Sequence, residues 1–460
     1  MLANEQQVGV QFRSIGLWVL FCATCLQLTL LQPYIVLIPG ERANLFSGVL
    51  CAAALLLPLI FGRTDVARPK LVEVIVSIIL TALAVVSSLL SKAPSSAMAR
   101  AFVIMSSSLG GFWCSRLLLG SREGRIFFSR FCLVLLGIAL ALALAGLKVS
   151  GQIDWFVGSH WHERASLIIL LSFAPLALLD SRSKPLIILA VLMLGLSYVT
   201  LVISAMNRGT KSIVIIPAIL LLLAACWRQW SIKRSALILA LLFFVSVMAV
   251  GHLRFRSQGL HLQHESVAYR VESIFFSWHI AVQNPVFGIG LWAPRDKYLE
   301  DYNMTYPYVS KDTFKEWVKS LRTSENTPLT FLVDLGFPFV IIYCGALIAI
   351  VLRLVRVAFQ PRVGSFPHPL ALLLPIIAAI LHFQVLDGLF HPQIGWFFHI
   401  LLGMVLGQSD LAVPHVEPKL RKAALLRMAV ALAVIILGSL VGMTLPKEAS
   451  SRFIGTFFVH

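Results

Sequence analysis

The sequence predicts an all-α fold, a polytopic bundle of membrane helices. Hydrophobic residues make up 58% of the 460 residues and charged residues only 13%, whereas soluble domains carry roughly 25% charged residues. The mean hydropathy is +0.86. The apolar residues form continuous runs long enough to cross a bilayer as helices, without the alternating pattern of a transmembrane β-barrel. This composition excludes a soluble globular domain, a disordered chain and a fibrous repeat.

Continuous apolar runs mark the candidate spans. In chain order they cover residues 15–38, 45–61, 71–91, 97–119, 126–147, 165–180, 186–205, 212–227, 235–251, 328–352, 370–386, 394–408 and 423–445. Three of them (165–180, 212–227 and 394–408) are short for a bilayer, so the sequence predicts about 12–13 spans. The first run is too long for a cleavable signal peptide and lacks a small-residue cleavage site, so we expect it to stay as an anchor.

Lysine and arginine residues concentrate in every second connection between the spans. The rich connections contain Arg63, Arg68 and Lys70; Arg116, Arg122, Arg125 and Arg130; Arg182 and Lys184; Arg228, Lys233 and Arg234; Arg353, Arg356 and Arg362; and Lys419, Arg421, Lys422 and Arg427. The positive-inside rule therefore predicts a cytoplasmic N-terminus. Contact with anionic lipid then explains the formal net charge of +17. We expect no nucleic-acid partner, because no nucleic-acid-binding motif is present.

One connection is much longer than the others. Residues 252–327 form a polar stretch that lies, by parity, on the non-cytoplasmic side. Helical periodicity over Val267–Gln283 and aromatic residues throughout predict a folded extracytoplasmic subdomain. The chain is therefore expected to divide into N-terminal membrane helices (1–251), a loop subdomain (252–327) and C-terminal membrane helices (328–460).

Two cations lie in a tight extracytoplasmic turn between the seventh and eighth spans, Arg208 and Lys211. Charges this close to the membrane are costly unless they are paired or functional. Arg208 is expected either to project into a cavity and bind an anionic group, most simply a phosphate, or to snorkel from an ordinary capped turn.

A further arginine lies on the predicted helix of the long connection. Arg270 is followed by Trp278 and His279, and the segment Asn-Pro-Val-Phe-Gly-Ile-Gly at 284–290 forms turns after the helix. The helix is expected either to cover a cavity that Arg270 faces, or to lie in the membrane interface with one solvated arginine.

A carboxylate stands at the start of the span after this connection. Ser324 or Asn326 can cap the helix, and Pro328 suits its first turn. Glu325 then lies beside the positive end of the helix. It is either a general base for a hydroxyl group or a charge that the helix dipole stabilises.

Three other polar groups lie on the same side. They are Arg164 within His160–Arg164, Asp387 with His391, and the histidines His261 and His264. The histidine spacing suits a metal ion, but no cluster of Cys or Asp accompanies it, so we expect no metal site.

Three of these segments follow one another in a recognisable order. They are the Arg-Gly turn at 207–212, the segment from Arg270 to Gly290, and Ser-Glu-Asn-Thr-Pro-Leu at 324–329 before a span containing Leu-Gly. They flank and fill the long connection. In this arrangement the sequence resembles the O-antigen ligase and O-antigen or exopolysaccharide polymerase family of bacterial inner-membrane glycosyltransferases, most strongly over residues 190–345.

This resemblance implies a C-type glycosyltransferase-like helical bundle that works at the periplasmic face. A glycan would leave an undecaprenyl-diphosphate carrier for a hydroxyl of lipid A-core or of a growing glycan, without a metal ion or another cofactor. The implied diphosphate-binding residues are Arg164, Arg208, Lys211 and Arg270, and the implied substrate-binding residues are Trp278, His279 and Asn326. Glu325 stands where the family commonly has His, so Glu325, aided or replaced by Asp387, would be the base.

Some alternatives remain open at this point. Aromatic residues of the long connection would either stack on sugars or pack the subdomain. They are Trp278, Trp292, Tyr298, Tyr302, Tyr306, Tyr308 and Trp317. A transporter or flippase of lipid-linked sugars or anions would need charges near the bilayer midplane, where His382, Asp387 and His399 are the nearest exceptions to an apolar pattern. A structural protein without catalysis is the third reading. Ligase and polymerase share a donor, so the sequence does not separate them.

Overall fold

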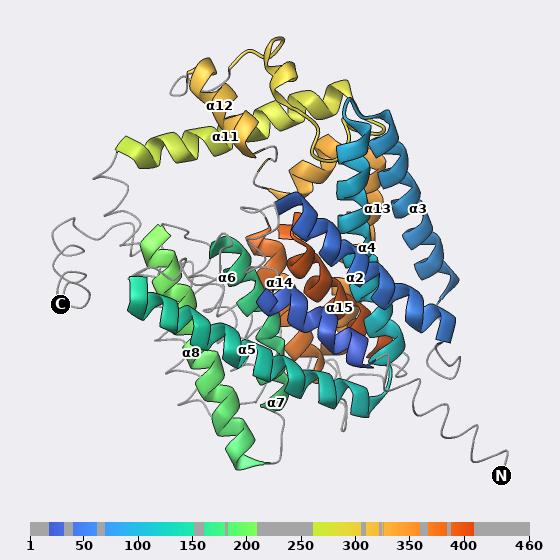
Figure 1. The fold of residues 1–460 in the computed structure, drawn as a ribbon, viewed down its shortest axis with the longest axis vertical. Coiled ribbons are helices and arrows are strands. Elements are labelled where there is room, and N and C mark those ends of the chain that lie inside the picture. Colours follow the sequence, from blue (N-terminus) through green and yellow to red (C-terminus); the bar gives the residue numbers. More distant parts are fainter. Residues whose placement is uncertain are drawn as a thin grey trace.

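The computed structural model describes residues 18–31, 40–61, 70–150, 161–179, 183–208, 261–304, 310–321, 324, 326–358, 367–383 and 388–408. All regular secondary structure in these ranges is helical, which confirms the predicted all-α membrane fold (Figure 1). Four of the described helices are long and apolar enough to cross a membrane. They contain Leu71–Leu90, Pro94–Leu118, Arg122–Leu142 and Thr327–Val355.

Most described helices coincide with predicted spans. They are α2 (Gly40–Phe61), α3 (Leu71–Leu90), α4 (Pro94–Leu118), α5 (Arg122–Ser150), α8 (Lys184–Arg208), α13 (Thr327–Ala358), α14 (Pro369–His382) and α15 (Pro392–Gln408). The first predicted span is helical over residues 18–26 and continues as a π-helical turn, Gln27–Leu31. The spans predicted at 212–227, 235–251 and 423–445 lie outside the described residues, so the count of 12–13 remains a prediction.

The span predicted at 165–180 consists of two helices, α6 (Trp161–Leu171) and α7 (Phe173–Leu178). Pro175 has no amide hydrogen, so the helical bond that it would donate to Leu171 is missing. The helical hydrogen bonding is therefore interrupted there, although Ser172 keeps helical dihedral angles (φ −63°, ψ −12°) and its hydroxyl donates to the Ile169 carbonyl at 2.6 Å. All residues of this pair from Ala165 onward are buried, which places the break inside the bundle.

Helix α4 lies at the centre of the bundle, packed against α2, α3 and α15. A Cβ atom on Gly110 would lie 2.8 Å from the Cys51 carbonyl oxygen, and one on Gly111 would collide with the Trp396 carbonyl. Small residues allow the helices to approach this closely. The Trp396 side chain is fully buried here, and its indole Nε1 donates to Cys25 Sγ at 3.4 Å.

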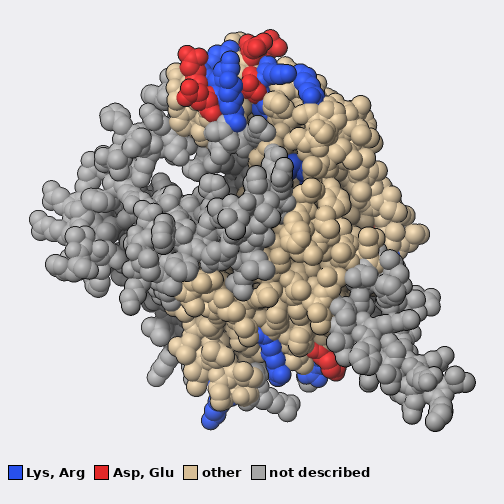
Figure 2. Space-filling model, viewed as in Figure 1, with Lys and Arg blue, Asp and Glu red and all other residues tan. Residues whose placement is uncertain are grey.

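The bundle has two polar ends. One, the loop end, carries α11 (His261–Gln283) and α12 (Lys311–Leu321), which lie across the top of Figure 1. At the opposite end, the far end, α3 begins and α4 and α13 finish. In the face shown in Figure 2, charged side chains gather mainly at two opposite ends with an uncharged band between them. This distribution suits a body that crosses a bilayer.

Candidate active site at the loop end

The loop end has a small apolar core of its own. The helix predicted over Val267–Gln283 is the larger part of α11, and α12 was not predicted. Their shared core contains Phe276, Ile280, Ile289, Ala293, Leu299, Tyr302, Phe314, Val318 and Val333. Trp317 stacks on Tyr269 with ring centroids 5.8 Å apart. Trp317 and Tyr302 thus pack the polar connection, whereas Tyr306 and Tyr308 lie outside the described residues.

The turn after α11 docks on a break in α13. Pro338 has no amide hydrogen for the Asp334 carbonyl, and Gly336 leaves the helical conformation with φ 81° and ψ 174°. The chain 284–290 supplies the missing partners. The Gly290 amide donates to the Asp334 carbonyl at 2.9 Å, and the Phe337 amide donates to the Pro285 carbonyl at 2.9 Å. The loop backbone therefore completes the hydrogen bonding of a membrane helix.

Glycines make this docking possible. Gly288 and Gly290 have φ of 63° and 92°, a region that other residues rarely adopt. A Cβ atom on Gly288 would lie 2.5 Å from the Val333 carbonyl oxygen, and one on Gly290 would collide with Ser91. The Asn-Pro-Val-Phe-Gly-Ile-Gly segment is thus a close-packed joint between the long connection, α13 and the end of α3.

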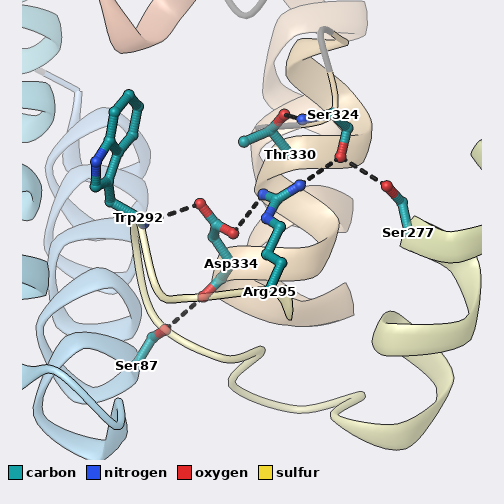
Figure 3. A network of polar contacts seen from close by, with 7 residues as sticks. All are labelled: Ser87, Ser277, Trp292, Arg295, Ser324, Thr330 and Asp334. Carbon is teal, nitrogen blue, oxygen red and sulfur yellow. Dashed lines mark hydrogen bonds and ion pairs between the residues drawn. The ribbon is translucent and has the colours of Figure 1, made fainter. Parts of the chain in front are cut away.

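A buried ion pair lies beside this joint (Figure 3). The Arg295 Nη2 atom is 2.7 Å from Asp334 Oδ1, and the two side chains are 3% and 0% exposed. The second Asp334 oxygen, Oδ2, accepts from the Trp292 amide at 3.2 Å. The Asp334 backbone carbonyl accepts from the Ser87 hydroxyl at 2.7 Å. A buried pair of this kind holds its elements in one arrangement, because either charge left alone would be costly.

The same network fixes the chain just before α13. Arg295 Nη1 donates to the Ser324 hydroxyl at 2.7 Å, and that hydroxyl shares a 2.7 Å hydrogen bond with the Ser277 hydroxyl of α11. The Ser324 amide donates to Thr330 Oγ1 at 3.0 Å. Ser324 is therefore held by three elements, α11, the loop and α13, and it directly precedes Glu325.

Asn326 is the residue that caps α13. Its Oδ1 accepts from the Leu329 amide at 3.0 Å, and Pro328 lies in the first turn as the sequence predicted. Ser324, the other predicted cap, is used by the buried network instead. The proposed bases Glu325 and Asp387 lie outside the described residues, as does Lys211.

Two hydrogen bonds bring three helix ends together beside Asn326. The Thr327 amide, at the start of α13, donates to the Phe383 carbonyl at the end of α14 at 2.9 Å. His382 Nδ1 and the Ser166 hydroxyl share a hydrogen bond of 2.8 Å. Arg164 lies two residues before Ser166 on α6. The structure thus brings the chain position of Arg164 to the start of α13.

For Arg208 and Arg270, the structure describes the position of the backbone but not that of the side chain. Arg208 ends α8, which runs toward the loop end in Figure 1, and Arg270 lies in the first half of α11. Helix α11 packs on α13. Convergence of the two guanidinium groups on one cavity remains a prediction, because these side chains, like that of Arg164, are outside the described ones.

The predicted substrate-binding residues of α11 have different surroundings. Trp278 is 53% exposed, with its ring 5.8 Å from Phe337 in an edge contact. His279 is half-buried, and its Nε2 lies 3.1 Å from the Gln283 side-chain nitrogen and its ring 5.2 Å from Tyr302. Trp278 therefore offers an accessible ring face, while His279 is partly engaged within the loop end.

Two cations near the start of α4 contact aromatic rings of the long connection, Lys92 just before the helix and Arg100 in its second turn. The Arg100 guanidinium lies 4.2 Å from the Trp292 ring centre and the Lys92 ammonium 4.9 Å from that of Tyr298. Burial raises the pKa of the Tyr298 phenol above its ordinary value. Trp292 has φ 62°, rare for a bulky residue. These contacts place the start of α4 and the long connection, both predicted to be extracytoplasmic, at the same end of the bundle.

Sequence reasoning missed the pairing of Arg295 with Asp334. A usable signal was present, since Asp334 lies inside the predicted span 328–352. An ionisable residue in a span is expected to be paired or functional. Arg295 gave no comparable signal, because it is one of several cations in a polar connection.

Comparison with known families gives one match that overlaps the loop end. A family described as O-antigen ligase matches residues 167–344. The matched segment is less than half of the chain, and it contains the docked turn, the buried ion pair and the start of α13. No curated protein matches the chain. The fold thus defines a helical membrane protein, and the match indicates a likeness to proteins of glycan transfer. Within that class, the chain resembles the O-antigen ligases over residues 167–344.

Proposed function

We propose that this protein is a periplasmic-face glycosyltransferase of the bacterial inner membrane. It transfers a glycan from an undecaprenyl-diphosphate carrier to an acceptor hydroxyl on lipid A-core or on a growing glycan. The observation that carries the proposal is the coincidence of the matched segment 167–344 with the loop-end assembly. In the proposed orientation the N-terminus is cytoplasmic and the loop end is periplasmic.

The proposed reaction is a displacement at the sugar carbon that bears the diphosphate. The acceptor oxygen forms a bond to this carbon, the carbon–oxygen bond to the diphosphate breaks, and the acceptor proton passes to Glu325, with Asp387 assisting. Arg208 and Arg270, joined by Arg164 and Lys211, hold the leaving diphosphate. Fixed guanidinium groups stabilise the charge that develops on it, so the proposal needs no metal ion.

The buried network supports this assignment through positioning. Ser324 is held by the Arg295 guanidinium, by Ser277 and by Thr330, and Asn326 is held as the cap of α13. Glu325 lies between these two fixed residues. A base that must reach one proton is most effective when its neighbours allow it little freedom. Asn326, Trp278 and His279 are proposed to contact the substrate around it.

A gel profile of the surface glycan in a deletion strain tests the proposal. The strain is complemented with wild type, Arg270→Ala or Lys319→Ala, the last removing an exposed cation of α12 at the same end. We expect Lys319→Ala to restore the glycan and Arg270→Ala to fail at equal protein level. If the strain without a working protein keeps long chains on the carrier, the protein is a ligase. If that strain makes products of only one repeat, the protein is a polymerase. Full restoration by Arg270→Ala would overturn the diphosphate assignment.

An assay with purified protein distinguishes glycan transfer from transport across a membrane. Carrier-linked glycan and acceptor are mixed with the protein in detergent, where no compartments exist, and the linked product is measured. Product formation that depends on Arg270 supports an enzyme. A protein that restores the glycan in cells but forms no product in this assay would instead be a transporter or flippase.

A further inference from the structure

The structure contains an apolar groove among the membrane helices, and its lining residue nearest in sequence to the loop-end network is Phe331. It has a volume of about 410 Å³ and lies between α3, α4, α13 and α15. Its lining includes Val76, Leu80, Leu109, Phe339 and Ile350. Neither Arg295 nor Asp334 lines it, so the groove does not include the buried ion pair.

The groove has the length of one leaflet of a bilayer. Its lining residues run from Lys70 to Leu80 on α3 and from Phe339 to Arg353 on α13, which is roughly 15 to 21 Å of helix at 1.5 Å per residue. The hydrocarbon core of a bilayer is about 30 Å thick, so one leaflet contributes about half of that. The groove therefore begins at the far end of the bundle and finishes near the middle of the membrane.

The groove opens sideways, between α3 and α13. Val72 of α3 and Ile341 of α13 line it and are also 69% and 66% exposed. Beside this opening the outer surfaces of both helices are apolar, with Ile75 and Ile348 exposed. A surface of this kind faces lipid chains, so a chain can enter the groove from the membrane.

Charged residues stand at the far end of the groove only. Its lining contains the cations Lys70 and Arg353 and one carboxylate, Glu73. The Glu73 carboxylate is shared, because its Oε2 lies 3.4 Å from Arg116 Nε and accepts from the Lys70 amide at 3.3 Å. Among the described residues that line the groove, positive charge is therefore in excess where the headgroup of a lipid would lie, which favours an anionic headgroup.

We propose that the groove binds one acyl chain of an anionic phospholipid from the leaflet at the far end, with its phosphate at Lys70 and Arg353. The polyprenyl tail of a glycan donor is a poorer fit, because its diphosphate would lie at the loop end, whereas the charged end of the groove is at the opposite end. The exclusion of the polyprenyl tail rests on the proposed function, whereas the lipid site itself does not.

Gly345 offers a selective way to fill the groove. It lines the groove, and a Cβ atom built on it meets no atom within 4 Å. Gly345→Leu should therefore occupy the space of the lipid chain without displacing protein atoms. Gly195 of α8 is the matched control, since a Cβ atom there also meets nothing within 4 Å and the residue is exposed.

The experiment is native mass spectrometry of the purified full-length protein titrated with dioleoyl phosphatidylglycerol or dioleoyl phosphatidylcholine. We expect wild type and Gly195→Leu to retain phosphatidylglycerol, and Gly345→Leu to lose one bound molecule. Arg353→Gln should bind phosphatidylglycerol roughly tenfold more weakly, since it loses one charge-assisted hydrogen bond, and should bind phosphatidylcholine unchanged. Lys184→Gln, at the exposed start of α8, is the control for charge.

Three results would overturn the proposal. They are equal retention of phosphatidylglycerol by Gly345→Leu and Gly195→Leu, equal affinity of wild type for both phospholipids, and displacement of phosphatidylglycerol by undecaprenyl phosphate with the same sensitivity to Gly345→Leu. If Gly345→Leu does not fold, the Arg353→Gln comparison decides alone, because an unchanged preference for phosphatidylglycerol contradicts the headgroup site.

Discussion

Replacing Asp334 by Asn tests whether the buried ion pair holds the long connection on the bundle. The side chain keeps its shape but loses the charge that faces Arg295, and both groups are almost fully buried. Breaking a buried pair by removing one partner costs about 3–5 kcal/mol. We expect the lower part of this range, because the backbone bond from Gly290 to the carbonyl of residue 334 does not involve the side chain.

Amide hydrogen exchange of the peptide over residues 284–295 measures this effect directly. A loss of about 3 kcal/mol corresponds to opening that is roughly a hundredfold more frequent. Asp301→Asn, at an exposed carboxylate of the same region, should change the free energy by less than about 0.5 kcal/mol. Arg295→Met combined with Asp334→Leu should cost less than the sum of the single changes, because no charge is left alone. Exchange in Asp334→Asn at the wild-type rate would refute this reasoning.

Three further changes are expected to lower thermal stability in detergent, each with its own comparison. Gly288→Ala should cost at least about 1–2 kcal/mol because of its φ of 63°, and a cost no greater than that of Gly195→Ala would contradict the close-packed joint. Asn326→Ala should cost about 1 kcal/mol and Asn326→Ser much less, since serine also caps helices; equal costs would argue against the cap. Tyr302→Phe removes the 2.6 Å hydrogen bond to the buried Glu272 carboxylate and should cost about 1–3 kcal/mol, whereas an unchanged melting temperature would show that this bond contributes little.

Hydropathy located the membrane helices well but not the breaks within them. The span predicted at 71–91 is Leu71–Leu90 in the structure, because continuous apolar sequence is what a membrane helix requires. The breaks at Ser172 and Gly336 were not predicted. Their prolines are visible in the sequence, but proline is tolerated in membrane helices, so its presence alone does not show where the chain bends.

The candidate site was predictable where its contacts are local. The cap by Asn326 joins residues three positions apart, and the sequence named Asn326 as one of two possible caps. The pair of Arg295 and Asp334 joins residues 39 positions apart, and only the docked turn brings them together. The roles of Glu325, Asp387 and Arg208 stay predictions, because they depend on side-chain positions outside the described ones.

The turn that completes α13 limits how the protein can move during the proposed reaction. Inside a bilayer, each backbone group without a partner costs several kcal/mol, so residues 285–290 cannot leave α13 without exposing the carbonyls of Val333 and Asp334. Residues 285–290 must therefore move together with α13 as one rigid body. Trp292 and Arg295 are also held on Asp334, so any movement of the long connection in the proposed reaction has to hinge beyond Arg295.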